Sequence, residues 1–211
     1  MERGKAPRPD ARIKLLDAAI QVIRQKGYAA TSVDDLCRAA GVTKGAFFHH
    51  FESKDALAVA AANHWSEGTS ALFASAPYHQ PKDPLDRVLA YIDFRTALLE
   101  GSVAEFTCLA GTLVQEAYGA SDAIRAACAA SIFGHAQTLE ADIEAARNKY
   151  HVDGDWSARS LALHTQAVLQ GAFVLAKADG GPAIAKEMAA HLKNYVRLLF
   201  AAHKKVRRSK P

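Results

Sequence analysis

Apolar residues recur every three or four positions along most of the chain, which is the spacing of one face of an α-helix. The first stripe, at Ile13, Leu16, Ile20 and Ile23, predicts a helix over residues 10–26. Alanine is abundant, β-branched residues are sparse, and no segment shows the alternation typical of a strand. The pattern therefore predicts an all-α fold.

Capping residues divide this pattern into nine predicted helices. Gly27 stands where the first helix would end, and Thr31 followed by Asp34 predicts the start of the second. Serine, threonine, aspartate and proline mark the later starts in the same way. The predicted helices cover residues 10–26, 32–39 and 43–50, then begin at Ser53, Asp83 and Ser102, and finally cover 121–150, 157–178 and 182–203.

Two short predicted helices flank Gly41 within residues 31–57, which is the spacing of a helix-turn-helix. Glycine suits such a turn because it adopts a positive φ without steric cost. Phe47 and Phe51 share the inward side of the second short helix with its capping residue, Thr43. The opposite side, which would face DNA, carries Lys44, Gly45, Phe48 and His49.

The segment AGVTKGAFFHHFESKDAL, from Ala40 to Leu57, resembles the DNA-binding signature of the tetracycline-repressor (TetR) family of transcriptional regulators. The chain length and the order of nine helices also fit that family, although the sharp motif is confined to about the first 57 residues. The resemblance implies an N-terminal three-helix DNA-binding head over residues 1–54. It further implies a ligand-sensing and dimerisation body over residues 55–211, and a homodimer that binds a double-stranded DNA operator.

The same resemblance implies which side chains contact DNA. The implied DNA-binding residues are Thr43, Lys44, Gly45, Phe48, His49, His50 and Lys54. Of these, Lys44, Gly45, Phe48 and His49 would lie in the major groove, and His50 and Lys54 near phosphates. Phe48 departs from the family, which often has tyrosine there, so a phosphate-binding hydroxyl is absent. Its ring can pack on a thymine methyl group, and the alternative for Phe48 is plain core packing.

Ligand sensing would fall to aromatic and polar residues on the inward stripes of the middle helices, for which core packing is the alternative. These candidates are Trp65, Tyr91, Phe94, Phe106, His135, Gln166, Gln170 and Phe173. An effector of unknown identity that prefers a conformation with wrongly spaced heads would weaken operator binding by that preference. The prediction is a repressor released from a pseudo-palindromic operator, with an activator on the same scaffold as an alternative.

Cys108 supports a further alternative, a sensor of electrophiles or oxidants. The segments 105–116 and 170–180 resemble a TetR subgroup in which some members respond to such compounds, and Lys177 is a candidate cation to favour the thiolate. A buried and inert Cys108 is the competing interpretation. Cys37 and Cys128 are predicted to be packing residues, and three widely spaced cysteines predict neither a disulfide framework nor a zinc site.

The last two predicted helices carry apolar stripes suited to an isologous dimer interface. The alternative is that these stripes complete the core of the monomer. The residues concerned are Leu161, Val168, Leu169, Ala172 and Leu175 on one helix, and Met188, Leu192, Val196 and Leu199 on the other.

Charge is distributed unevenly over the 211 residues. The net charge is +4 for residues 1–54, −5 for 55–199 and +5 for 200–211, which indicates a polyanion-binding end on a body with another task. Arg3, Lys5 and Arg8 form a basic arm, and residues 203–210 form a basic tail.

No catalytic, cofactor or metal motif occurs, and no membrane span or secretion signal is evident, so we expect a bacterial cytoplasmic protein that is not an enzyme.

Overall fold

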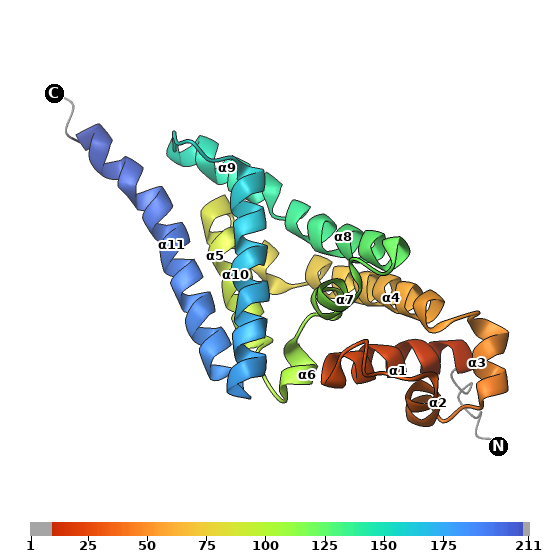
Figure 1. The fold of residues 1–211 in the computed structure, drawn as a ribbon. Helices are drawn as coiled ribbons and strands as arrows, with labels where there is room; N and C mark the ends of the chain where they lie inside the picture. The colour runs from red at the N-terminus through yellow and green to blue at the C-terminus, as the bar shows by residue number, and fades with distance from the viewer. Residues whose placement is uncertain (1–9, 209–211) are drawn as a thin grey trace, which may run out of the picture. The chain divides into compact units, whose positions relative to one another are not determined.

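The computed structural model describes the backbone of residues 10–208 and the side chains of residues 10–201. The basic arm and the basic tail therefore lie outside the described side chains. Within the described backbone there are eleven α-helices, one short 3₁₀ helix and no strand, which confirms the all-α prediction (Figure 1). The elements are α1 Ala11–Lys26, α2 Val33–Ala40, α3 Lys44–His50, α4 Lys54–Ala74, η1 Pro77–His79, α5 Pro84–Ala97, α6 Val103–Phe106, α7 Leu109–Ala117, α8 Asp122–Gln137, α9 Glu140–Tyr150, α10 Ala158–Asp179 and α11 Ala183–Arg208.

The chain divides into two compact units. The first contains the chain up to Gly68 together with Leu109–Cys128, and the second contains Thr69–Cys108 and the chain from Ala129 onward. This division differs from the predicted boundary after residue 54, because α7 packs against α1 and so joins the first unit. Helices α4 and α8 each contribute residues to both units.

In the first unit, α1 packs against α2, α3 and α7. The side chains of Leu15, Leu16 and Ile23 on α1 are almost fully buried. Phe47 of α3 is also fully buried and Phe51 is 6% exposed, as predicted for the inward side of that helix. The turn between α2 and α3 is made by Gly41, whose φ is +64°.

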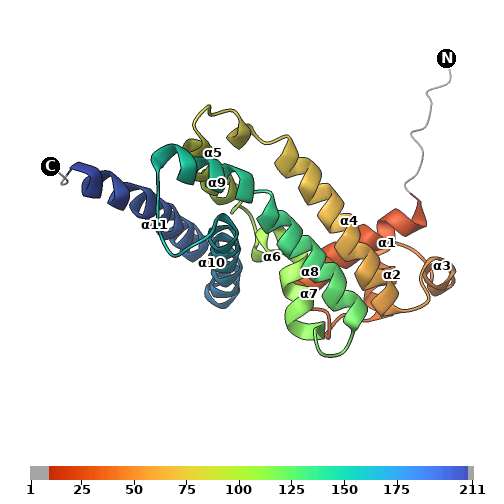
Figure 2. The same ribbon diagram turned by 90° about the horizontal axis from the view of Figure 1, so that it is seen from above.

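In the second unit, α10 and α11 pack along each other, which is visible in two perpendicular views (Figures 1 and 2). Helix α5 packs against α9 and α11, and α9 also packs against α10. The fully or almost fully buried side chains of this core include Tyr91, Ile92, Ile143, Leu169 and Val196. Burial of such apolar surface is the main force that holds these helices together.

The predicted stripes on α10 and α11 divide between two environments. Five of the predicted residues are buried in the core of the chain itself, namely Leu161, Leu169, Ala172, Leu192 and Val196. Three more, Val168, Met188 and Leu199, are partly buried against that core. Leu175 is 42% exposed, and three other apolar residues of the same two helices, Val174, Tyr195 and Leu198, are exposed by 43% or more. These two helices thus retain exposed apolar side chains after the core is complete.

The start of α2 differs from the prediction. Ser32, not Thr31, caps the helix: its hydroxyl accepts a hydrogen bond from the Asp35 amide at 3.1 Å, and the Asp35 carboxylate accepts from the Ser32 amide at 3.0 Å. Thr31 is 1% exposed and donates its hydroxyl to the Gly27 carbonyl at 2.6 Å. The Thr31 hydroxyl is thus directed toward the end of α1, and the hydroxyl of Ser32 accepts from the first turn of α2.

Two of the nine predicted helices are each divided in the structure, which raises the count to eleven. The predicted helix from Ser102 ends at Phe106, because Thr107 adopts an extended backbone before α7 begins. The predicted helix over 121–150 is interrupted after Gln137. There the amides of Thr138 and Leu139 bond to carbonyls only three residues back, at 3.2 and 3.1 Å, and Leu139 turns into the core with 2% exposure.

The two neighbouring phenylalanines of α3 have opposite environments, which gives a matched pair of variants. Phe47→Ala should lower the free energy of unfolding by about 3–5 kcal/mol, because it removes a fully buried ring. Phe48→Ala should change it by less than about 0.5 kcal/mol, because Phe48 is 57% exposed. Urea denaturation followed by circular dichroism measures both, and equal losses would contradict the described packing of α3.

Candidate DNA-binding surface and sensing cluster

The outer side of α3 brings together four of the predicted DNA-binding residues. The hydroxyl of Thr43 caps the helix by accepting from the Ala46 amide at 3.1 Å. With Phe47 buried, the exposed side carries Lys44, Gly45, Phe48 and His49. A side chain added at Gly45 would meet nothing nearer than the Thr43 hydroxyl, at 3.8 Å, so packing within the protein does not require glycine there. The free space suits close approach by another molecule.

Lys44 forms an ion pair at the edge of this surface. Its ammonium lies 2.8 Å from the Asp34 carboxylate, which raises the pKa of Lys44 through the hydrogen bond and the opposite charge. The two side chains are 61% and 58% exposed, and water screens pairs of this kind so that they contribute little to stability. The pair can therefore be exchanged for a contact with DNA at little cost.

Lys54 has a different environment from the one predicted. Its ammonium donates hydrogen bonds to the carbonyls of Tyr28 and Thr31, at 3.1 and 3.0 Å, and lies 4.1 Å from the centre of the Tyr28 ring. The Tyr28 hydroxyl in turn donates to Asp55, and burial together with that carboxylate raises the pKa of Tyr28. Through these hydrogen bonds Lys54 connects the loop between α1 and α2 to the start of α4. A contact between Lys54 and a DNA phosphate stays a prediction.

His50 lies at the end of α3 and is partly buried. Its Nε2 atom is 3.9 Å from a carboxylate oxygen of Asp10, the residue that caps α1. A contact between His50 and a phosphate, like that of Lys54, stays a prediction.

In the second unit, three predicted sensing residues meet in one hydrogen-bonded chain. The Gln166 side-chain amide donates to the Tyr91 hydroxyl at 3.0 Å, and that hydroxyl lies 2.8 Å from Nε2 of His135. Arg95 lies 3.5 Å from the same nitrogen, and a guanidinium can only donate. Nε2 of His135 is therefore the acceptor, and the ring is neutral with its proton on Nδ1.

Burial, and then the positive charge of Arg95, lower the pKa of His135 to about 4. Burial raises the pKa of Tyr91, which is 0% exposed. Both groups are thus held in their uncharged forms at neutral pH. The three side chains joined by these hydrogen bonds, Gln166, Tyr91 and His135, are therefore uncharged, and the neighbouring Arg95 is charged.

Aromatic rings surround this chain. Phe94, a predicted residue, contacts Phe73 with ring centres 5.4 Å apart and Tyr78 at 5.8 Å. Phe73 also lies 4.4 Å from the His135 ring. The sequence analysis did not single out Phe73, Tyr78 or Arg95. Arg95 follows Tyr91 by four positions and so shares its helix face. This spacing could have indicated Arg95 from the sequence.

The remaining predicted sensing residues lie outside this chain. The rings of Phe106 and Phe173 are 6.4 Å apart, and Cys108 packs against the same small cluster, half-buried. Gln170 is half-buried and Lys177 is exposed. Trp65 belongs to the first unit, where the Arg24 guanidinium lies 4.6 Å from its ring centre. Cys37 and Cys128 are buried, as predicted, with 6% and 0% exposure.

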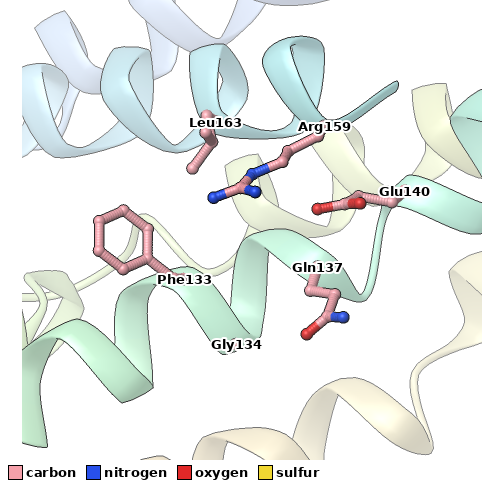
Figure 3. A pocket seen from close by; sticks show the side chains of 6 residues that line it. All are labelled: Phe133, Gly134, Gln137, Glu140, Arg159 and Leu163. Carbon is pink, nitrogen blue, oxygen red and sulfur yellow. The ribbon is translucent and has the colours of Figure 1, made fainter. Parts of the chain in front are cut away.

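A separate hollow of about 240 Å³ opens between α8, α9 and α10. In Figure 3 the Arg159 guanidinium extends toward Phe133 and Leu163, with Glu140 nearby. The residues that line it are Phe133, Gly134, Gln137, Glu140, Arg159 and Leu163. None of the predicted sensing residues is among them.

Comparison with known proteins places the chain in a family. The family described as "Bacterial regulatory proteins, tetR family" matches residues 15–61, which contain α2 and α3. The family described as "Tetracyclin repressor-like, C-terminal domain" matches residues 84–192, about half of the chain. The protein therefore belongs to the TetR family of bacterial regulatory proteins, as the sequence resemblance indicated.

Individual relatives are distant. The HTH-type transcriptional repressor DhaR of Mycobacterium sp. (strain GP1) is 29% identical over 118 residues, which are 56% of this chain and 58% of DhaR. The HTH-type transcriptional regulator AcrR of Shigella flexneri is 30% identical over 103 residues, or 49% of this chain and 46% of AcrR. The chain thus spans about half the length of the curated relatives it matches.

Solved structures extend the similarity of fold to most of the chain. A TetR-family regulator from Agrobacterium tumefaciens has a TM-score of 0.77 at 21% identity, covering 88% of this chain and 96% of that one. The reduced form of E. coli NemR has a TM-score of 0.73 at 25% identity, with the same coverage. Among the described residues, no helix is both long enough and apolar enough to cross a membrane.

The depressed pKa of His135 predicts a loss of stability in mild acid. As the pH falls below 6.5, a histidine in the unfolded chain takes up a proton, whereas His135 in the folded protein does not do so until about pH 4. Unfolding is therefore favoured, and the free energy of unfolding should fall by about 2 kcal/mol between pH 7 and 4.5. Urea denaturation at several pH values measures this slope.

Two variants assign the slope to the buried histidine. His135→Gln should flatten it, while His191→Gln, which removes a histidine whose side chain is 69% exposed, should leave it unchanged. The same slope in both variants would show that other groups cause the loss of stability.

Proposed function

We propose that the protein is a DNA-binding transcriptional repressor that acts as a homodimer and is released from a pseudo-palindromic operator by a small molecule. The observation that carries the proposal is the exposed side of α3, where burial of Phe47 turns Lys44, Gly45, Phe48 and His49 outward together. Helices presented in this way enter the major groove, where base edges can be distinguished. The chain is similar to the transcriptional repressor DhaR, and this similarity supports repression rather than activation as the proposed role.

Dimerisation follows from the apolar side chains that α10 and α11 leave exposed. Val174 and Leu175 on α10, with Tyr195 and Leu198 on α11, are between 42% and 67% exposed. A two-fold interface made by this pair of helices would bury them against their own copies. Two heads related by a two-fold axis bind two half-sites of inverted sequence, so the proposal includes a pseudo-palindromic operator.

Selection of bound sequences from random DNA, with purified protein at two salt concentrations, tests the proposal. We expect a pseudo-palindrome that is still enriched at the higher salt, because base contacts persist when phosphate contacts are weakened. Recovery of unrelated sequences that disappear with salt would overturn the proposal, since it would mean that the basic segments bind DNA only as charge.

A substitution on α3 tests the role of its exposed side. Lys44→Ala should weaken binding to the selected operator by about 1–3 kcal/mol and relax the preference at one base position, if its ammonium contacts a base edge. The control is Arg125→Ala, which removes one cation from α8, where the side chain is 58% exposed. Titration of labelled operator by fluorescence anisotropy gives both affinities, and equal weakening by the two variants would contradict a base contact.

A further inference from the structure

Arg95 is a cation held among aromatic rings. It lies on α5, one turn after Tyr91, and is partly exposed. The carbon at the centre of its guanidinium is 5.3 Å from the ring centre of Phe73 and 5.7 Å from that of Phe173. The faces of these rings attract the cation, but they do not neutralise it.

No carboxylate among the described side chains pairs with Arg95. Three acidic residues along or near α5 have other partners: Asp142 binds Arg87 at 2.6 Å, Glu100 binds Lys186 at 2.6 Å, and Asp93 binds Lys193. Asp86 lies in the first turn of α5, nine positions before Arg95. The nearest polar groups of Arg95 are instead the neutral Tyr91 and His135. A partly buried cation without a counter-ion is unfavourable, so the site favours an anion supplied from outside.

The surroundings narrow the class of that anion. Among the described side chains, Arg95 is the one cation in contact with Phe73, Phe173 and His135, and His135 is neutral. One positive charge matches a singly charged anion better than a doubly charged phosphate. The planar fork of a guanidinium fits the two oxygens of a carboxylate. The rings of Phe73 and Phe173, which contact the guanidinium, are 6% and 5% exposed, and the half-buried ring of Phe94 contacts Phe73, so the surroundings of the guanidinium are apolar.

We propose that Arg95 binds the carboxylate of a small monoanionic effector whose apolar part packs against the surrounding phenylalanine rings. Gln166 and Tyr91 position His135, which keeps the guanidinium in place beside the rings. This inference rests on the proposed function, because it names the class of small molecule that releases the operator.

Calorimetric titration of the full-length protein without DNA tests the inference. The probes are sodium benzoate and sodium cinnamate, each paired with its uncharged amide, benzamide and cinnamamide. We expect at least one carboxylate to bind, with an affinity at least tenfold higher than that of its amide. Failure of both carboxylates to bind, or equal affinity for acid and amide, would overturn the inference.

Variants then assign the binding to one side chain. Arg95→Gln should weaken carboxylate binding at least tenfold, and Arg95→Lys should give an intermediate affinity because it keeps the charge but loses the planar fork. Arg159→Gln is the matched control, since it removes an exposed arginine of the same unit that lines the separate hollow. Unchanged affinity in Arg95→Gln would contradict the inference.

Two further measurements keep the result interpretable. Circular dichroism reports whether Arg95→Gln is folded, and if it is not, the comparison of Arg95→Lys with the unaltered protein decides. In that case an affinity of Arg95→Lys equal to that of the unaltered protein counts against the inference. Because the titration contains no DNA, its failure would leave operator binding intact, whereas failure of the proposed function would be seen in the DNA selection.

Discussion

The candidate DNA-binding surface depends on the burial of the Phe47 ring. Helix α3 has only seven residues, too few to be stable by itself in water, so its existence and its orientation come from packing against α1 and α2. The ring of Phe47 is fully buried, and the side chains of Phe48 and His49, one and two positions further on, are exposed. The chemistry of the outer side can then vary while the buried ring keeps the helix in place.

Much of this arrangement could be predicted from local signals, and the exceptions have physical causes. The caps at Thr43 and Gly41 follow from residue type alone. At the start of α2, however, Thr31 and Ser32 are each followed three positions later by aspartate, and only the burial of Thr31 decides between them. Lys54 was predicted to lie near a DNA phosphate, and that contact stays a prediction. Its hydrogen bonds to two loop carbonyls were not predicted, because sequence does not show which carbonyls fold back onto a helix start.

Three residues of the candidate sensing site were predicted from the sequence, and Arg95 was not. Tyr91, His135 and Gln166 lie on inward stripes, and the structure joins them by hydrogen bonds although they are 44 and 75 residues apart. Arg95 shares the face of Tyr91, yet a charged residue on an inward stripe is ordinarily assigned to the surface, because buried charge is unfavourable. Gln166, Tyr91 and His135 are uncharged at neutral pH, so Arg95 carries the one charge among these four side chains.

The loop after α1 limits how far this protein can be treated as modular. Gly27 has a φ of +87°, and a Cβ atom there would lie 2.5 Å from a carboxylate oxygen of Glu116, while the other oxygen of Glu116 accepts from the Ala29 amide at 2.8 Å. A residue of α7 therefore completes the backbone hydrogen bonding of the head, although about 90 positions separate them in sequence. A chimaera that joined this head to a foreign body at residue 54 would leave the Ala29 amide without its acceptor. A transferable form of this head therefore includes α7 together with α1, α2 and α3.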